Sequence, residues 1–153
     1  MITSDVVMGR DIKIYHPELV NLYGCSIGDN TRIGSFVEIG RNVKIGKNCK
    51  IEAFAFIPEG VIIEDNVFVG PHACFTNDKI PRAASASGPR KGDEWTLEKT
   101  LVKEGASIGA NATIVCGITI GRNALVGAGS VVTKDVAENT TVIGNPARVK
   151  KQV

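Results

Sequence analysis

An apolar residue returns at every sixth position, without interruption, from residue 27 to residue 75. Neither the 3.6-residue period of a helix face nor the two-residue period of a strand face specifies this spacing. Six is a multiple of two, so short strands joined by regular corners fit it, and hexapeptide repeats are typical of parallel β-helices. The nine anchor positions are Ile27, Ile33, Ile39, Ile45, Ile51, Ile57, Ile63, Val69 and Phe75.

Three further positions of each hexad are also restricted. The fourth residue after each anchor is small or β-branched, from Thr31 to Ala73, so each hexad would fill the interior with one large and one small side chain. Glycine often follows the anchor, and asparagine often stands two residues later, as in Gly28 and Asn30. Both residues tolerate tight or left-handed backbone, which predicts a corner in every hexad.

The hexads stop after Phe75 and resume at Val102, where the anchors continue to Val132 and the second inward set runs from Ala106 to Val136. Three hexads would form one triangular coil that rises by about 4.8 Å, the spacing between strands. We therefore predict a single-domain, all-β parallel β-helix of five to six coils. Its expected parts are an N-terminal cap (1–23), coils (24–76 and 102–136) and a C-terminal cap (137–153).

The interval between Phe75 and Val102 is 27 residues, which is not a multiple of six, so residues 77–101 must leave the helix. A long loop in a compact domain is usually a binding loop or a linker. We interpret this one as a binding loop because an excursion from a regular rod can add recognition. It contains the only tryptophan, Trp95, with Pro81, Pro89, Gly88, Gly92, Ser85, Ser87, Lys79, Arg82, Arg90, Lys91 and Lys99.

The overall charge and hydropathy narrow the classes of partner. The formal net charge is +2, and acidic and basic residues are mixed along the chain, so no nucleic-acid or membrane surface is indicated. No apolar run approaches the length of a membrane span, and the first residues do not form a signal-like apolar block. We expect a cytoplasmic protein. The four cysteines lack metal-ligand spacing, and Cys25 and Cys49 fall at inward positions.

These hexads, the glycine-rich stretch 127–136 and Gly144-Asn145-Pro146-Ala147 resemble those of the left-handed β-helix acyltransferases. The resemblance implies a homotrimer that binds acetyl-coenzyme A between neighbouring subunits. It also implies the left hand of the helix, which a period of six does not reveal and which the usual crossover rule would not predict.

Three motifs resemble a narrower group within that family. They are Phe75-Thr76-Asn77-Asp78, Pro81-Arg82-Ala83 and the segment 21–25. The group acetylates the amino group of nucleotide-linked amino sugars for surface polysaccharides. The resemblance favours the 3-amino group of a UDP-linked 2-acetamido-3-amino uronic acid, with a dTDP-linked 3-amino-deoxyhexose as the alternative acceptor. A hydroxyl acceptor and a non-catalytic trimeric scaffold remain as further alternatives.

Acyl transfer to an amine requires positioned reactants, a donor to the developing oxyanion and a destination for the proton. The candidate catalytic residues are Asn77, His72 and Asp78. Asn77 either holds the amine or an acyl oxygen, or forms a left-handed corner. Asp78 either orients the amine or begins a turn. His72 is either a base, as imidazole titrates near neutrality, or a structural residue, in which case the leaving thiolate takes the proton.

Further residues are candidates for binding the two substrates. Arg82, Arg90 and Lys91 could pair with a diphosphate or a carboxylate, and Asn21 and Tyr23, expected two coils below Asn77, could meet the uridine. Coenzyme A would lie against glycines that leave room for pantetheine, with basic residues at its phosphates. These cofactor candidates are Gly109, Gly127, Ala128, Gly129, Lys134 and Arg148.

A zinc enzyme of the same fold is a weaker alternative. A carbonic anhydrase of this type asks for three histidine ligands, whereas the chain holds only His16 and His72. We therefore expect no metal site.

Overall fold

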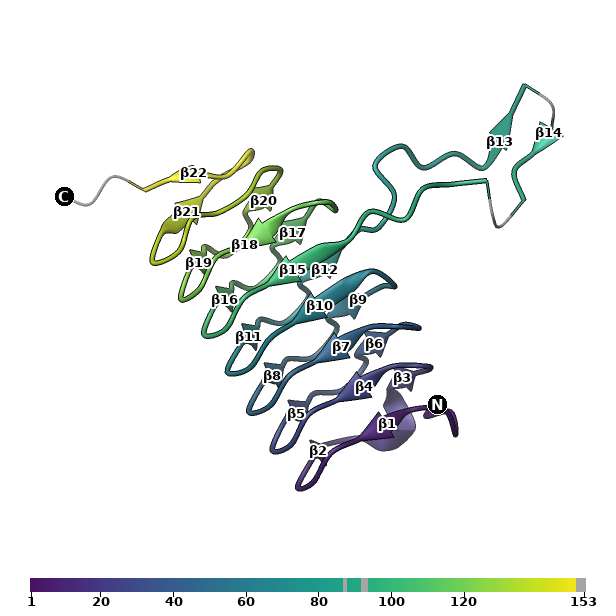
Figure 1. Ribbon diagram of the computed structural model, residues 1–153, viewed down its shortest axis with the longest axis vertical. Helices are drawn as coiled ribbons and strands as arrows, with labels where there is room; N and C mark the ends of the chain where they lie inside the picture. Colours follow the sequence, from purple (N-terminus) through teal and green to yellow (C-terminus); the bar gives the residue numbers. More distant parts are fainter. Residues whose placement is uncertain (87, 92–93, 151–153) are drawn as a thin grey trace.

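The computed structural model describes residues 1–86, 88–91 and 94–150, which fold as a left-handed parallel β-helix with a protruding loop (Figure 1). This confirms the predicted fold class. Ser87 and Gly92 of the expected binding loop, and residues 151–153 of the expected C-terminal cap, lie outside the described residues.

Short strands stack into three parallel sheets, which we call the first, second and third faces. The first face contains β1 (Val7–Met8), β4 (Ser26–Ile27), β7 (Lys44–Ile45), β10 (Val61–Ile63), β15 (Thr100–Val102) and β18 (Thr119–Ile120). The second contains β2 (Lys13–Ile14), β5 (Arg32–Ile33), β8 (Lys50–Ile51), β11 (Phe68–Val69), β16 (Ser107–Ile108), β19 (Leu125–Val126), β21 (Thr141–Ile143) and the antiparallel β22 (Arg148–Val149). The third contains β3 (Asn21–Leu22), β6 (Glu38–Ile39), β9 (Phe56–Ile57), β12 (Cys74–Phe75), β17 (Thr113–Ile114) and β20 (Val131–Val132).

The helix has about seven coils, which corrects the predicted five to six. The additional coil at the N-terminal end comes from β1, β2 and β3, which pair in parallel with β4, β5 and β6. Hexad counting missed it because the 3₁₀-helix η1 (Pro17–Leu19) separates the inward Ile14 from Leu22 by eight residues instead of six. At the other end, β21 adds a strand to the second face.

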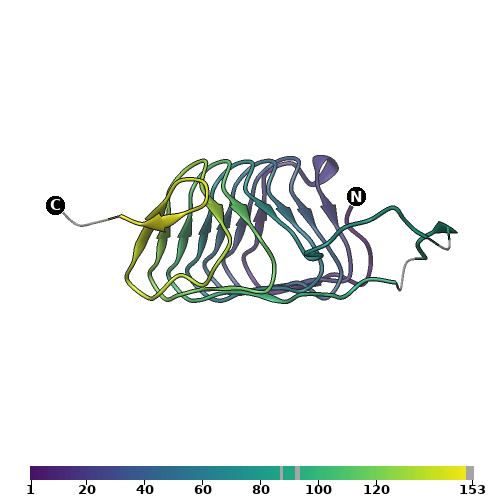
Figure 2. The ribbon, with the colours of Figure 1, turned by 90° about the horizontal axis from the view of Figure 1, so that it is seen from above.

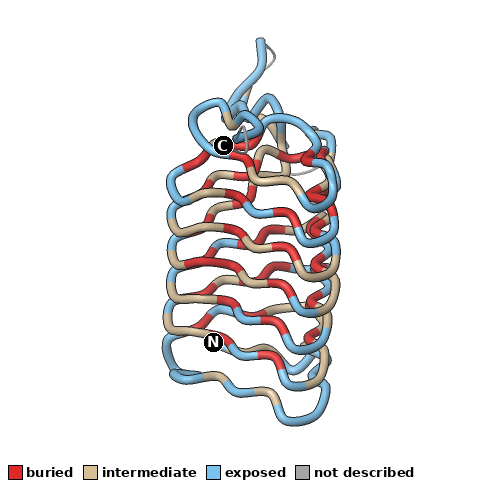
Figure 3. The backbone as a smooth tube through the Cα atoms, turned by 90° about the vertical axis from the view of Figure 1, so that its left-hand side faces the viewer, coloured by how far each residue is buried: buried red, intermediate tan, exposed pale blue. Residues whose placement is uncertain are grey.

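Both inward sets of the hexads are buried, as predicted, and the buried stretches repeat from coil to coil in Figure 3. The small position includes Cys25 and Cys49, whose side chains contribute to this core. The four cysteines are all free thiols. One continuous column of apolar side chains therefore runs along the helix axis and holds successive coils together.

Each corner restricts two positions of the hexad, one by its backbone conformation and the other by the space available. The third residue after the anchor has a positive φ, as predicted for Asn30 (φ 57°) and Asn66 (φ 60°). The glycine directly after the anchor serves a different purpose from the left-handed backbone that we expected. A Cβ atom on Gly28 would lie 2.6 Å from the carbonyl carbon of Gly46 in the next coil, so this position needs glycine because neighbouring coils approach closely.

Residues 77–99 leave the edge between the third and first faces and extend beyond the coils (Figures 1 and 2). Thr100 and Leu101, which we expected in the loop, already belong to β15 and pair with β10. The end of this loop is a small antiparallel hairpin of β13 (Ala84–Ser85) and β14 (Gly88–Pro89).

Within the described ranges, no helix reaches the length and apolarity that a membrane crossing requires.

Replacing the glycine of one close approach should destabilise the helix. In Gly46→Ala, the new Cβ would lie 2.6 Å from the backbone nitrogen of Asp65, and we expect a loss of about 1–3 kcal/mol in the free energy of unfolding. Gly129→Asn is the matched control because Gly129 has a positive φ but no atoms within 4 Å of the position that a Cβ would occupy. Denaturant titration measures both. Equal stability of the two variants would contradict the close-approach explanation.

Candidate active site

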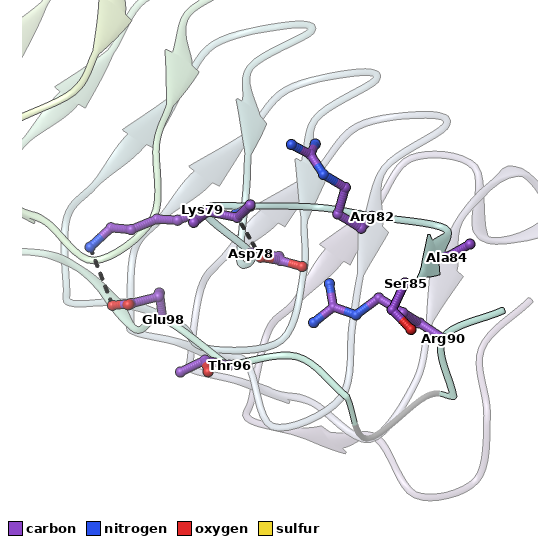
Figure 4. A pocket seen from close by; sticks show the side chains of 9 residues that line it. Asp78, Lys79, Arg82, Ala84, Ser85, Arg90, Thr96 and Glu98 are labelled. Atoms are coloured by element: carbon purple, nitrogen blue, oxygen red, sulfur yellow. Dashed lines mark hydrogen bonds and ion pairs between the residues drawn. The ribbon is translucent and has the colours of Figure 1, made fainter. Parts of the chain in front are cut away.

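The foot of the loop is fixed by contacts between its outgoing and returning arms. The backbone carbonyl of Asn77 accepts a hydrogen bond from the Glu98 amide at 3.0 Å, and Lys79 forms an ion pair with Glu98 at 3.5 Å (Figure 4). On the returning arm, the Thr100 amide donates to the Gly60 carbonyl at 3.0 Å. The loop therefore leaves the helix at a defined position beside Asn77.

Asn77 and Asp78 differ in how the structure uses them. Asn77 is half-buried and has no positive φ, so it is not one of the left-handed corner residues that formed its alternative interpretation. The Asp78 carboxylate accepts a hydrogen bond from the Ile80 amide at 2.8 Å, which is the turn-starting arrangement. Asp78 therefore has a structural partner, whereas the Asn77 side chain has no hydrogen bond to any described residue.

The basic candidates of the loop gather around Asp78. An open cavity of about 660 Å³ between the loop arms is lined by Asp78, Arg82 and Arg90, among others (Figure 4). An adjoining hollow adds Lys91 and Trp95 to the same group. Arg82 donates to the Pro81 carbonyl at 3.2 Å, and Arg90 donates to the Glu94 carbonyl. The three cations predicted to bind anions thus share one concave region.

A second concavity lies below Asn77 on the outer surface of the third face, and we call it the third-face groove. It is lined by Tyr23, Arg41, Phe56, Pro58, Glu59 and Asn77. Of these residues, only Tyr23 and Asn77 had been predicted. Glu59 precedes Asn77 by 18 residues and Arg41 precedes it by 36. Since one coil contains 18 residues, the coil period alone predicts that both residues lie beneath Asn77.

The vertical distance within this groove differs from the prediction. Tyr23 lies three coils, or about 14 Å, below Asn77, whereas we predicted two coils. The difference arises because β3 forms part of the additional N-terminal coil. Asn21 lies on β3 with an exposed side chain and does not line the groove. The structure therefore brings Tyr23 and Asn77 onto one surface and leaves Asn21 outside it.

Tyr23 has a defined electrostatic environment. Its hydroxyl donates a hydrogen bond to the Glu38 carboxylate at 3.2 Å. Burial is the largest cause that raises the pKa of the Tyr23 phenol, and the Glu38 carboxylate raises this pKa further. Arg41 acts in the opposite direction. The phenol is thus a neutral hydrogen-bonding group at the lower end of the groove.

His72 lies at a different edge, between the second and third faces. It occupies a left-handed corner (φ 59°), and its ring stacks on Phe54 at 4.5 Å, which stacks on Phe36 at 4.7 Å. We call these three residues the aromatic ladder. His72 and Asn77 are five positions apart along extended chain, a span of about 16 Å. A single chain therefore does not bring the candidate base and the candidate amide together.

The cofactor candidates fall into two places. Gly129 is on the same edge as His72, two coils above it, with positive φ and open space around it. Gly109 lies beneath Gly127 and Ala128, where a Cβ would be 2.5 Å from the Ala128 nitrogen, so its glycine is required by coil packing. The other two candidates, Lys134 and Arg148, line a separate hollow at the C-terminal end of the helix.

Neither thiols nor metal ligands form a second candidate site. Burial raises the pKa of the thiols of Cys25, Cys49 and Cys74, which keeps them protonated. Residues 1–86, 88–91 and 94–150 contain no group of three or more His, Cys, Asp or Glu side chains arranged to hold a metal ion.

Comparison with known families identifies the repeats. The family described as bacterial transferase hexapeptide (six repeats) matches residues 42–77 and 99–134. A second family, the hexapeptide repeat of succinyl-transferase, matches residues 24–57. The two matches together cover more than half of the chain.

Several known proteins are similar to parts of this chain. A dTDP-3-amino-3,6-dideoxy-alpha-D-galactopyranose 3-N-acetyltransferase of Aneurinibacillus thermoaerophilus is 58% identical over 55 residues, which are 36% of this chain and 29% of that protein. A galactoside O-acetyltransferase of Lactococcus lactis is 31% identical over 97 residues, covering 61% of this chain and 46% of that protein. The chain thus spans less than half the length of either relative.

A solved structure shows the same fold over nearly the whole chain. It is a point mutant of AntD, an N-acyltransferase from Bacillus cereus, in complex with dTDP and coenzyme A. The TM-score is 0.78, with 21% sequence identity, and the match covers 95% of this chain and 82% of that chain. At this identity, the similarity shows the fold alone.

The environment of Tyr23 predicts a measurable titration. In a Tyr15→Phe variant, Tyr23 is the only remaining tyrosine, and we expect its phenol to ionise above pH 10.0. Adding Glu38→Gln should lower this pKa only partly, because burial, the larger cause, remains. Since the unfolded phenol ionises first as pH rises, this group also makes the folded state less stable above that pH. Ultraviolet absorbance of the phenolate measures the titration, and an unshifted folded phenol would contradict the assigned environment.

Proposed function

Because the chain belongs to the hexapeptide-repeat transferases, we propose that it is an enzyme that transfers an acetyl group from acetyl-coenzyme A to the amino group of a nucleotide-linked 3-amino sugar. The main support is the position of Asn77, where the regular helix is interrupted and the third-face groove adjoins the basic loop cavity. The Asn77 side-chain amide has no hydrogen bond to a described residue, so it can bind the acceptor amine. The loop cations can bind anionic groups elsewhere on the acceptor.

The reaction needs few chemical groups from the protein. The neutral amine attacks the thioester carbonyl, a C–N bond forms, and the C–S bond then breaks with release of coenzyme A. Asn77 either orients the amine or donates a hydrogen bond to the developing oxyanion. The amine proton passes to the His72 imidazole or to the leaving thiolate. Positioning of the two reactants accounts for most of the remaining rate enhancement.

The proposed enzyme is a homotrimer with its sites between subunits. Asn77 and His72 lie at opposite edges of the third face, so a site that uses both requires the Asn77 edge of one subunit and the His72 edge of another. The His72 edge also carries Gly129, where open space suits the pantetheine arm. In this arrangement, coenzyme A lies along the His72 edge, and the acceptor lies in the third-face groove of the neighbouring subunit.

Two acceptors fit the basic loop. A UDP-linked 2-acetamido-3-amino uronic acid would use Arg82, Arg90 and Lys91 for both its diphosphate and its carboxylate. A dTDP-linked 3-amino-deoxyhexose needs them for the diphosphate alone, and the relative from A. thermoaerophilus is named for such a sugar. Either product would supply surface polysaccharide synthesis, and the proposed cellular location is the cytoplasm.

A hydroxyl acceptor is the second candidate. The galactoside O-acetyltransferase relative favours it, and so does the position of His72, which is exposed at its corner. A hydroxyl is a weaker nucleophile than a neutral amine, so this reaction depends on a base. The variant His72→Asn separates the two functions, because asparagine keeps the left-handed corner and removes the imidazole.

The first experiment measures thiol release from acetyl-coenzyme A in the presence of UDP- and dTDP-linked 3-amino sugars. We expect activity with at least one of them, and Asn77→Ala should reduce kcat about 10²-fold or more if its amide stabilises the oxyanion. Asn48→Gly is the control, because it keeps a left-handed corner (φ 54°) on an edge remote from the site. No release with any amine would exclude the proposed reaction and favour a scaffold. Rapid transfer to hydroxyl sugars alone would support the second candidate.

The aromatic ladder predicts the behaviour of the proposed trimer. Phe36 is 50% exposed and Phe54 is 47% exposed, and both are in left-handed backbone that phenylalanine adopts at a cost. Replacing both by Asn should leave the β-helix at least as stable but convert a trimer into monomers of 16.2 kDa. Light scattering measures the mass and circular dichroism checks the fold. A variant that stays trimeric would show that the ladder is outside the interface.

A further inference from the structure

The third-face groove continues below Asn77, and the proposed reaction uses only its upper end. We infer that Arg41 and Glu59 determine which acceptors fit this groove. In this arrangement Glu59 accepts a hydrogen bond from a hydroxyl of the amino sugar, and Arg41 binds the diphosphate attached to that sugar. The inference rests on the proposed function, since it assumes that the acceptor amine lies at Asn77.

The parallel register places these residues in a single column. Glu38 pairs with Phe56, and Phe56 pairs with Cys74, so the residues three positions later occupy equivalent places in successive coils. These residues are Arg41, Glu59 and Asn77. Successive members are separated by about 4.8 Å along the axis, the spacing of paired strands. The column therefore sets fixed heights below the amine at which other parts of an acceptor can be bound.

Arg41 has the properties of an anion ligand. It is exposed in the groove, and its guanidinium makes no hydrogen bond or ion pair with any described residue. Its stem passes close to Gly24, where an added Cβ would lie 3.1 Å from the Arg41 Cγ. An arginine with a supported stem and unused donors can bind a phosphate in a bidentate manner.

Glu59 is held more firmly than Arg41. Its carboxylate accepts a hydrogen bond from the side-chain amide of Asn42 at 2.8 Å. The adjacent Pro58 is buried, and Gly60 lies under the Leu97 side chain of the loop, which would be 2.9 Å from a Cβ added to this glycine. A carboxylate has about four lone-pair sites, so one bond to Asn42 leaves acceptor capacity for a sugar hydroxyl.

The heights match the dimensions of a 3-amino sugar nucleotide. Two coils, or about 10 Å, are of the order of the distance from an amine on C3, across the ring and the anomeric oxygen, to the diphosphate. With the amine at Asn77, the sugar ring is level with Glu59 and the diphosphate is level with Arg41. The base then lies toward Tyr23, whose hydroxyl would be 3.3 Å from a Cβ added to Gly40, the neighbour of Arg41. Arg41 thus takes the place of the loop cations as the ligand of the diphosphate, and Arg82, Arg90 and Lys91 remain available for a carboxylate of the acceptor.

The test compares a nucleotide-linked 3-amino sugar with the same sugar lacking the nucleoside diphosphate. We expect Arg41→Gln to raise KM for the nucleotide-linked acceptor about 10- to 100-fold with little change in kcat, the size of effect of a charge-assisted hydrogen bond. Arg41→Gln should change KM much less for the sugar that lacks the nucleoside diphosphate. Glu59→Gln should raise KM for both acceptors by a similar factor. Arg32→Gln, an exposed arginine of β5 outside the groove, is the matched control.

Two outcomes would overturn this inference. In one, Arg41→Gln raises KM equally for the nucleotide-linked sugar and for the sugar without the nucleotide. In the other, Arg41→Gln changes KM for neither acceptor. If the wild-type protein acetylates no amino sugar, the proposed function fails by itself, and thermal shifts with UDP and dTDP then decide the role of Arg41. A wild-type shift that is lost in Arg41→Gln but kept in Arg32→Gln supports a nucleoside-diphosphate site. An equal shift in both variants excludes it.

Discussion

The stacking of each coil on the next at the strand spacing is the constraint on which the rest of this structure depends. Parallel pairing at that spacing leaves no room for a Cβ atom after several anchors, as at Gly28 and Gly46. It also requires a left-handed residue at most corners, which asparagine or glycine usually supplies. The same stacking aligns residues 18 positions apart into columns along the outer faces, so a functional residue in one coil defines the positions of its neighbours in others.

The loop is compatible with this stacking because it leaves and returns without changing the register. Cys74 pairs with Thr113 above the loop as it pairs with Phe56 below it. Contacts at the foot, between Asn77 and Glu98 and between Lys79 and Glu98, join the two arms before the chain rejoins the first face. The loop thus adds a concave region lined by Arg82, Arg90 and Lys91 beside the third-face groove.

Much of the fold, but less of the candidate site, could be predicted from the sequence. The hexads identified the buried residues and the corners because each requirement recurs in a fixed phase. The first coil was missed because η1 inserts residues between Ile14 and Leu22 and breaks that phase. Arg41 and Glu59 were missed because motif resemblance draws attention to residues near Asn77 in sequence, whereas the groove joins residues that are 18 apart. The separation of His72 from Asn77 follows from the triangular section, in which successive hexads end at different edges.

That separation and the aromatic ladder lead to the same conclusion about the working unit. Phe36, Phe54 and His72 occupy corners where most other coils have asparagine or glycine, so each carries a backbone cost that its own coil does not require. Stacking among the rings offsets part of this cost, yet both phenylalanines remain about half exposed in the single chain. A neighbouring subunit that covers the ladder would offset the remaining backbone cost by burying apolar surface. The same contact would bring a second chain to the edge that carries His72 and Gly129. Burial of the ladder and completion of the site would then be one event, which is a physical reason for a β-helix of this kind to act as an oligomer.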